Sequence, residues 1–113
     1  MDEKNIYSRT EILLGNENLE KLKRSVVMVC GLGGVGGYTA EALIRIGVGK
    51  IIFVDSDCTD STNLNRQILS TEKTVGIPKV DSAVERAKSI NSLLSIVMGI
   101  GLPCRFPTTS FCF

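Results

Sequence analysis

The sequence predicts an α/β fold in which parallel strands are joined by helices. Two apolar runs of strand length, 26–30 and 51–54, are separated by a glycine-rich segment and a helical pattern. Strands that alternate with amphipathic helices indicate βαβ units and a parallel sheet. The length of 113 residues is that of one domain.

The elements before the glycines are a helix and a strand. Residues 16–24 predict a short helix, because oppositely charged side chains recur there four positions apart. Residues 26–30 are apolar and mostly β-branched, which is typical of a strand buried on both faces of a parallel sheet. We therefore expect Cys30 to lie in the core.

The next elements complete a βαβ unit. A helix is predicted up to Gly47, which should end it as a left-handed cap. Residues 51–54 predict a second buried strand, and its crossover from the first should be right-handed. The large apolar side chains of the helix recur at helical spacing and are expected to face the core: Val35, Tyr38, Ala42, Leu43 and Ile46.

The remaining pattern is one polar segment, one helix and one short strand. Residues 55–77 are polar and irregular, and Pro78 suits the first turn of the helix that follows. A third strand is expected at 95–98. The apolar stripe of the helix is Val80, Ala83, Val84, Ala87 and Ile90.

Composition excludes several classes of function. The net charge of +1 gives no general electrostatic attraction for nucleic acid. The absence of histidine excludes a Ser-His-Asp triad and any histidine metal site within this chain. No apolar run reaches transmembrane length and the charged opening residues are unlike a signal peptide, so we expect a cytoplasmic protein without a membrane partner.

The glycine-rich segment is the strongest local signal. Gly31, Gly33 and Gly36 have the spacing of the dinucleotide-binding fingerprint, which permits a tight turn and a close approach of phosphate to backbone. The segment follows a strand and opens a helix, whose N-terminus favours an anion. This context predicts a Rossmann-like βαβ nucleotide-binding unit; a purely structural turn is the alternative.

Polar side chains follow at the carboxyl edge of the predicted sheet. Asp55 ends the second strand, where a carboxylate commonly binds ribose hydroxyls, and Asp57 adds a second carboxylate. Asn63, Arg66 and Lys79 bring amide and cationic groups to the same edge. A triphosphate needs such cations more than NAD does. From the residues alone, a phosphate clamp and solvated surface side chains remain equally open.

Residues 7–91 resemble the ubiquitin-activating-enzyme-like (ThiF/MoeB-type) superfamily, whose members adenylate carboxylates with ATP. The resemblance is carried by residues 31–36, 54–57, 62–67 and 75–79, which agree in order and spacing. Within the superfamily, residues 7–15 look like those of tRNA threonylcarbamoyladenosine dehydratases more than those of sulfur-carrier adenylyltransferases.

The resemblance implies a set of site residues. ATP and Mg²⁺ are the implied cofactors, and a modified tRNA or a ubiquitin-like carrier protein is the implied partner. Arg9 would act as a catalytic residue in the partner subunit's site of a homodimer, and Arg66 and Lys79 would stabilise charge during catalysis. The implied nucleotide-binding residues are Gly31, Gly33, Gly34, Gly36, Asp55, Asp57, Asn63, Arg66 and Lys79.

The chain departs from the family pattern after the third helix. Family members continue with further strands and a second acidic motif that binds magnesium, whereas no Asp or Glu follows Glu85 here. Arg105 is the only charged residue after Lys88. We therefore expect a partial ATP-binding domain at 1–98, the N-terminal part of a doubly wound sheet, and an atypical, truncated or frame-altered tail at 99–113.

Four functions are considered on this basis. The first is a dehydratase-like adenylating enzyme, and the second is an adenylyltransferase for a sulfur carrier. The third is a nicotinamide-dependent oxidoreductase, which would not need Arg66 or Lys79. The fourth is an inactive nucleotide-binding fragment.

A partial sheet predicts low stability. We expect the apolar faces of both strands, including Phe53, to remain partly open, and the isolated chain to melt early or to aggregate. Thermal melting followed by circular dichroism measures this. A sharp cooperative transition above about 50 °C, ordinary for an intact domain, would contradict the expectation.

Overall fold

A computed structural model describes residues 3–98, and the side chains of residues 6–96. Its elements are α1 (Glu3–Leu14), α2 (Asn16–Lys23), β1 (Val26–Cys30), α3 (Gly34–Ile46), β2 (Lys50–Val54), the 3₁₀ turn η1 (Ser61–Asn63), α4 (Lys79–Ile90) and β3 (Ser95–Met98). The α/β fold and the third strand are confirmed, whereas α1 was not predicted. The expected tail, 99–113, lies outside the described residues.

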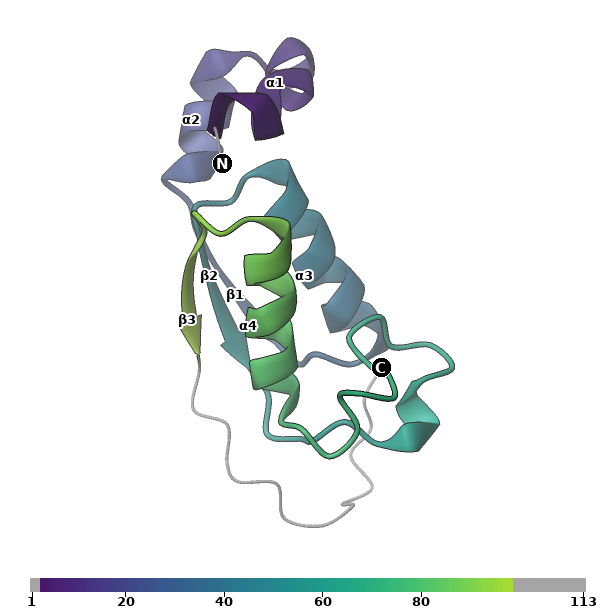
Figure 1. Ribbon diagram of the computed structural model, residues 1–113. Coiled ribbons are helices and arrows are strands. Elements are labelled where there is room, and N and C mark those ends of the chain that lie inside the picture. The colour runs from purple at the N-terminus through teal and green to yellow at the C-terminus, as the bar shows by residue number, and fades with distance from the viewer. Residues whose placement is uncertain (1–2, 99–113) are drawn as a thin grey trace.

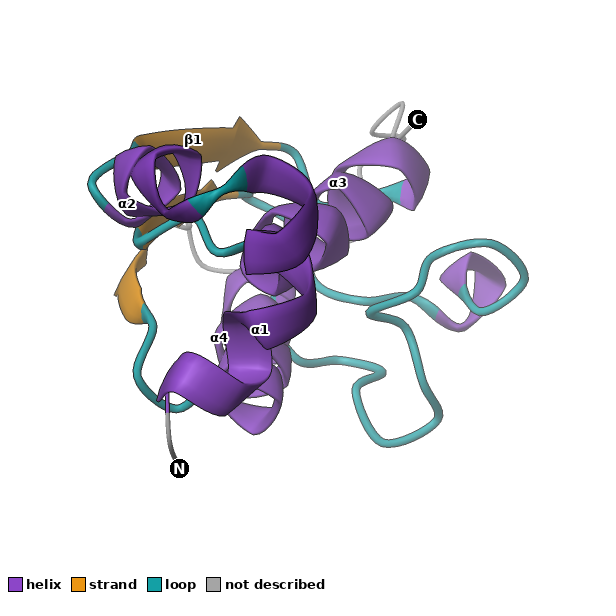
Figure 2. Ribbon diagram, turned by 90° about the horizontal axis from the view of Figure 1, so that it is seen from above, coloured by secondary structure: helices purple, strands orange, loops and turns teal. Residues whose placement is uncertain are grey.

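The three strands form one parallel sheet in the order β1-β2-β3. Helices α3 and α4 lie side by side on one face of it (Figures 1 and 2). Helix α3 contacts β1, and α4 contacts β2 and β3. The core lies between this face and the two helices, where Ile51 and Phe53 are fully buried.

The second face of the sheet is open within the described residues, and this corrects two predictions. Val26 and Met28 are each 57% exposed, and Cys30 is also exposed, so β1 is not buried on both faces. Because side chains alternate along a strand, these residues share the face that carries no helix. Phe53 points to the opposite, covered face, so the expectation that it would remain partly open is wrong.

Helix α3 packs on a face that shares only Leu43 with the predicted stripe. Val35 and Tyr38 are 66% and 56% exposed, whereas its buried residues are Gly37, Ala40 and Ile44. A Cβ on Gly37 would lie 3.1 Å from Cγ2 of Ile68, so the absence of a side chain lets the helix approach its neighbours closely. The predicted stripe was therefore misplaced, because it leaves out Gly37, Ala40 and Ile44. The stripe predicted for α4 is confirmed.

The two N-terminal helices lie beyond the amino ends of the strands (Figure 1). Tyr7 is buried and anchors α1: its ring lies against Gly47, and its hydroxyl accepts a hydrogen bond of 2.7 Å from Nδ2 of Asn91. Gly47 adopts a left-handed conformation, with φ of 104°, as the predicted cap of α3. Every helix within residues 3–98 is too short or too polar to span a bilayer.

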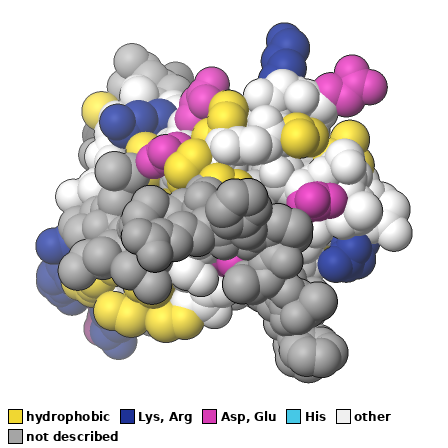
Figure 3. All heavy atoms as spheres, turned by 90° about the horizontal axis from the view of Figure 1, so that it is seen from below, with side chains coloured by type: hydrophobic (Ala, Val, Ile, Leu, Met, Phe, Trp, Pro, Cys, Tyr) yellow, Lys and Arg dark blue, Asp and Glu magenta, His cyan; other side chains and the backbone are white. Residues whose placement is uncertain are grey.

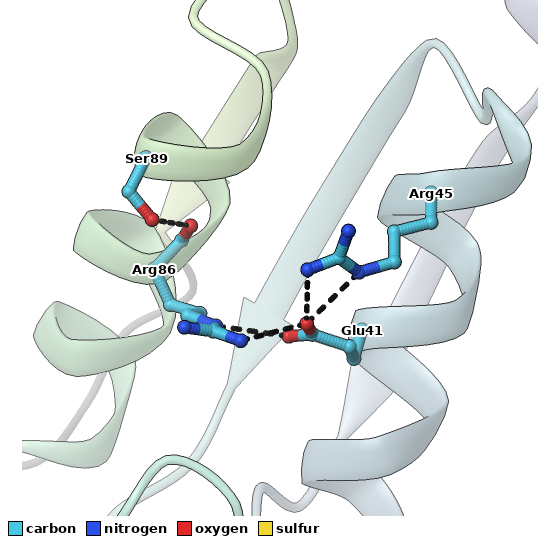
Figure 4. Close-up of polar contacts among 4 residues, drawn as sticks. All are labelled: Glu41, Arg45, Arg86 and Ser89. Carbon is cyan, nitrogen blue, oxygen red and sulfur yellow. Dashed lines mark hydrogen bonds and ion pairs between the residues drawn. The ribbon is translucent and has the colours of Figure 1, made fainter. Parts of the chain in front are cut away.

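A charged cluster joins α3 to α4 (Figure 4). Oε1 of Glu41 lies 2.9 Å from Nη2 of Arg86 and 2.9 Å from Nη2 of Arg45. The Glu41 side chain is only 13% exposed, although its position in the sequence pattern places it on the polar side of α3. Hydrogen bonding to Arg86, helped by Arg45 and opposed by burial, holds the pKa of the Glu41 carboxyl below its ordinary value.

This cluster makes stability depend on pH. Because the pKa of Glu41 is lower in the folded state, its contribution is present above the ordinary value of 4.5 and is lost as the pH falls through the folded value. We expect Glu41→Gln to reduce the loss of stability on acidification. Urea unfolding at several pH values between about 3 and 6 measures this. An unchanged acid slope in the variant would contradict it.

Candidate nucleotide-binding site

The glycine loop links the end of β1 to the start of α3 by a tight turn. The Gly31 amide donates a 2.8 Å hydrogen bond to the carbonyl of Val54, and its φ of +91° is a conformation that favours glycine. A Cβ on Gly36 would lie 1.7 Å from the Gly31 carbonyl oxygen. Glycine at these two positions is therefore required by the backbone itself.

The start of α3 offers unsatisfied backbone donors. Its N-cap is Gly33, no side chain caps it, and its first turn carries no acidic residue. The first amides of a helix have no partner within the helix, and the helix dipole places partial positive charge there. Gly34 is the first residue of this helix. The arrangement suits a phosphate group.

Asp55 ties the glycine loop to the end of β2. Its Oδ2 accepts a 2.7 Å hydrogen bond from the Leu32 amide, and its Oδ1 accepts one of 2.7 Å from the Asp57 amide. The residue is 9% exposed. Each carboxylate oxygen can accept more than one hydrogen bond, so Asp55 retains capacity for a ribose hydroxyl.

The long segment after Asp55 returns to the same edge of the sheet. The Lys79 amide donates a 2.9 Å hydrogen bond to the carbonyl of Asp57. The backbones of Cys58 and Pro78 pair in an isolated antiparallel β-bridge. Lys79 is buried, with an exposed fraction of 2%. The structure thus brings the glycine loop, Asp55, Asp57 and Lys79 together, as their order in the sequence predicted.

Asn63 ends the η1 turn and Arg66 follows it in the same segment, and their side chains bond locally. Oδ1 of Asn63 accepts from the Asp60 amide in a capping box. Arg66 is exposed, and its Nη1 donates to Oδ1 of Asn65 at 3.0 Å. Both residues lie on the segment that follows β2, but the predicted clamp on a triphosphate is not formed by these bonds.

Arg9 lies away from this edge. It is an exposed residue of α1, beyond the amino ends of the strands, whereas Asp55 follows the carboxyl end of β2 (Figure 1). The view from below shows acidic and basic side chains on the surface near the carboxyl ends (Figure 3). Arg9 is therefore not brought to the glycine loop of its own chain.

The structure also shows buried polar groups that the sequence did not single out. Three buried side-chain atoms have no hydrogen-bond partner among residues 3–98: Oγ1 of Thr59, Nε2 of Gln67 and Oγ of Ser82. Gln67 stands beside Arg66 in a motif that resembles the family, but nothing in its pattern indicated burial. Groups of this kind commonly mark ligand or water sites.

The described residues do not form a metal cage of their own. Residues 3–98 contain no group of three or more Cys, Asp or Glu side chains arranged to hold an ion. Mg²⁺ at nucleotide sites is commonly held by phosphates and one or two carboxylates, which differs from an all-protein site.

These features define a Rossmann-like α/β unit whose glycine loop is shaped for a nucleotide phosphate. Residues 7–99 match the ThiF family, and the chain belongs to this family. It is 50% identical over 91 residues to the tRNA threonylcarbamoyladenosine dehydratase of Bacillus subtilis. The matched region covers 80% of this chain and 36% of that protein. The chain thus spans about a third of that relative's length.

Other relatives have names that state different activities. The chain is 45% identical over 92 residues to the adenylyltransferase and sulfurtransferase MOCS3 of Culex quinquefasciatus, covering 80% of this chain and 21% of that protein. Among solved structures, the ATP complex of the Escherichia coli dehydratase TcdA matches with a TM-score of 0.85 and 33% identity, over 88% of this chain and 41% of that one. The ATP complex of E. coli MccB matches with a TM-score of 0.77 and 32% identity, over 84% of this chain and 30% of that one.

Proposed function

We propose that this chain binds ATP between the glycine loop, Asp55 and the start of α4, as part of an enzyme that activates a carboxylate by adenylation. The observation that carries this is the tether from Asp55 to the Leu32 amide, which fixes the glycine loop beside the uncapped start of α3. The likeness to the ATP complex of TcdA supports the choice of nucleotide. We assign this unit to residues 1–98.

The site residues have separate roles in this proposal. The amides at Gly33 and Gly34 bind phosphate oxygens, whereas Gly31 and Gly36 allow the loop to adopt its shape, since the Gly31 amide already donates to the Val54 carbonyl. Asp55 accepts hydrogen bonds from the ribose, and Asp57 lines the same end of the site. Asn63 and Arg66 bind the triphosphate once their side chains have given up their bonds to Asp60 and Asn65, and Lys79 binds it from the start of α4. Arg9 acts in the site of a second subunit, because its place on α1 is remote from its own loop.

The proposed reaction is nucleophilic substitution at phosphorus. A carboxylate oxygen of the substrate bonds to the α-phosphorus of ATP, the bond from that phosphorus to the bridging oxygen breaks, and pyrophosphate leaves with the electron pair. Catalysis consists of holding the two reactants in line and stabilising charge with Arg66 and Lys79. No proton needs to be removed from a carboxylate, which suits a chain without histidine.

The favoured substrate is the carboxylate of threonylcarbamoyladenosine in tRNA. Once adenylated, this carboxyl group would close into a ring within the nucleoside, and AMP would leave. The higher identity to the dehydratase, 50% against 45% for MOCS3, supports this choice over a ubiquitin-like sulfur carrier. The cytoplasmic setting and a homodimer are parts of the same proposal. A nicotinamide-dependent oxidoreductase is less supported, because the matched structures include ATP complexes.

Isothermal titration with Mg-ATP tests the proposal directly. We expect one ATP to bind per chain, and we expect titration with NADH to release no comparable heat. Lys79→Ala should weaken ATP binding by about tenfold. Lys73 is exposed in the loop before α4, and Lys73→Ala should change ATP binding little. Equal binding of NADH, or equal effects of the two variants, would contradict the proposal. Pyrophosphate release stimulated by modified tRNA or by a carrier protein would identify the substrate, and its absence with both would leave only a nucleotide-binding fragment.

A further inference from the structure

Two helices begin at residues that bind phosphate in the proposed nucleotide site. Helix α3 begins at Gly34, and α4 begins at Lys79. The two helices contact each other and lie side by side on the same face of the sheet (Figures 1 and 2). A triphosphate that is bound by both helix starts requires a fixed separation between them. The position of α3 against α4 therefore sets the shape of the site.

The residues that these two helices bury are mostly small: Gly37 and Ala40 of α3, and Ser82, Ala83 and Ala87 of α4. Packed helices are fixed along their axes by ridges of side chains that fit into grooves. Small residues make low ridges, so they resist sliding of one helix along the other only weakly. A further constraint is needed to fix α3 against α4.

A bidentate ion pair between the two helices supplies such a constraint (Figure 4). Arg86 of α4 donates to both carboxylate oxygens of Glu41 of α3, from Nη2 to Oε1 at 2.9 Å and from Nε to Oε2 at 3.1 Å. Two parallel bonds fix the direction of the pair as well as its length. Arg45 donates to the same carboxylate from within α3, with its Nε 3.0 Å from Oε1. The Glu41 side chain is therefore held in one orientation.

This ion pair lies at the same distance behind both helix starts. Glu41 follows Gly34 by seven positions, and Arg86 follows Lys79 by seven positions. Seven residues are close to two helical turns, or roughly 10 Å along each axis. Helices are rigid elements over this length, so a bond that fixes the two axes at Glu41 and Arg86 also fixes the separation of the two starts.

We propose that Glu41 and Arg86 are positioning residues for ATP: their bidentate bond holds the Gly34 amide and the Lys79 side chain at the separation that one triphosphate spans. This inference rests on the proposed function, and it adds two residues that act on the nucleotide only through the starts of α3 and α4. Groups that contact a ligand are held in place in this way by hydrogen bonds behind them.

Titration of the whole chain with Mg-ATP, in a cycle of single and double variants, tests this inference. Glu41→Gln keeps the shape of the side chain but removes its charge, and it should weaken ATP binding about fivefold. Arg86→Gln should have a similar effect. The double variant should bind ATP about as tightly as either single variant, because both substitutions remove the same bond.

Arg45→Gln is the matched control for the bond between the helices. It removes a partner of the same Glu41 carboxylate, but that partner lies within α3. We expect ATP affinity to stay within about twofold of that of the unchanged chain. Urea unfolding of each variant gives its folded fraction, so that the affinities of folded chains are compared.

A second cycle separates positioning from a purely structural role. Because Glu41 acts largely through Lys79, Glu41→Gln should weaken ATP binding by less than about 1.5-fold in a chain that already carries Lys79→Ala. An ion pair that only stabilises the fold would change affinity by the same factor with and without Lys79. Where Glu41→Gln does not fold, Arg86→Lys gives the same readout: it keeps the charge but loses the planar fork, and it should weaken ATP binding about threefold.

The outcomes distinguish this inference from the proposed function. Equal effects of Glu41→Gln and Arg45→Gln would overturn the inference, and so would an effect of Glu41→Gln that persists undiminished beside Lys79→Ala. In both cases the unchanged chain still binds ATP, and the proposed function stands. Absence of ATP binding by the unchanged chain, or no effect of Lys79→Ala, would overturn both.

Discussion

Replacing Gly36 with alanine is expected to abolish ATP binding and to lower stability. The added Cβ would lie 1.7 Å from the carbonyl oxygen of Gly31 and 2.7 Å from its carbonyl carbon. Both are backbone atoms that cannot rotate away, so the loop or the start of α3 must shift. Overpacking of this kind costs about 1–3 kcal/mol of folding stability. A shifted loop also takes its amides away from the phosphate that they would bind. Urea unfolding and titration with ATP measure the two effects.

Gly49→Ala is a matched control for this prediction. A Cβ on Gly49 would also lie 1.7 Å from a backbone carbonyl oxygen, that of Lys23. Gly49 directly precedes β2 and so lies far from the glycine loop. We expect a comparable loss of stability, with ATP affinity retained by the folded fraction at low temperature. If Gly49→Ala removed ATP binding as fully as Gly36→Ala, loss of folding would explain both, and the loop would have no specific role.

Replacing Asp55 with asparagine is expected to have the second largest effect. The carboxylate accepts hydrogen bonds from two amides, at Leu32 and Asp57, through different oxygens. Asparagine has one carbonyl oxygen, so its NH₂ group would face one of these donors. Losing one bond to a charged, buried acceptor costs about 2 kcal/mol, a factor of about 30. Both the free energy of unfolding and the ATP affinity should fall.

Asp81→Asn is the control for the loss of charge. Asp81 is exposed in the first turn of α4, so its neutralisation should cost less than about 1 kcal/mol and leave ATP affinity nearly unchanged. The prediction for Asp55 would be wrong if Asp55→Asn bound ATP as tightly as the unchanged chain. Asp55→Ala, which removes both acceptors, should bind more weakly still.

The sheet and the glycine loop were predictable because their signals are local. Two apolar runs of strand length flank a glycine spacing that only a tight turn requires, and Asp55 follows directly. The contact between α3 and the core was misplaced by the apolar pattern, because the small residues Gly37 and Ala40 share it with Ile44. The exposure of β1 depends on what covers the second face, which no pattern within these five residues encodes.

The local bonds of the η1 turn and the position of α1 were also beyond the sequence. Whether Asn63 caps its own turn or reaches a ligand depends on a side-chain rotation, which spacing does not determine. Helix α1 leaves Ile12 and Leu13 more than 80% exposed, so it has no clear amphipathic pattern. It is held instead by Tyr7, through a partner 84 positions away.

That long-range bond sets an order of events during synthesis. The ring of Tyr7 can meet Gly47 once α3 has emerged from the ribosome, but its hydroxyl must wait for Asn91, which follows α4. Helix α1 is synthesised first, but its hydrogen bond to Asn91 is among the last contacts to form. Until Asn91 is made, α1 is held only by the packing of the Tyr7 ring, and it stays more open to chaperones and to proteolysis than in the finished chain.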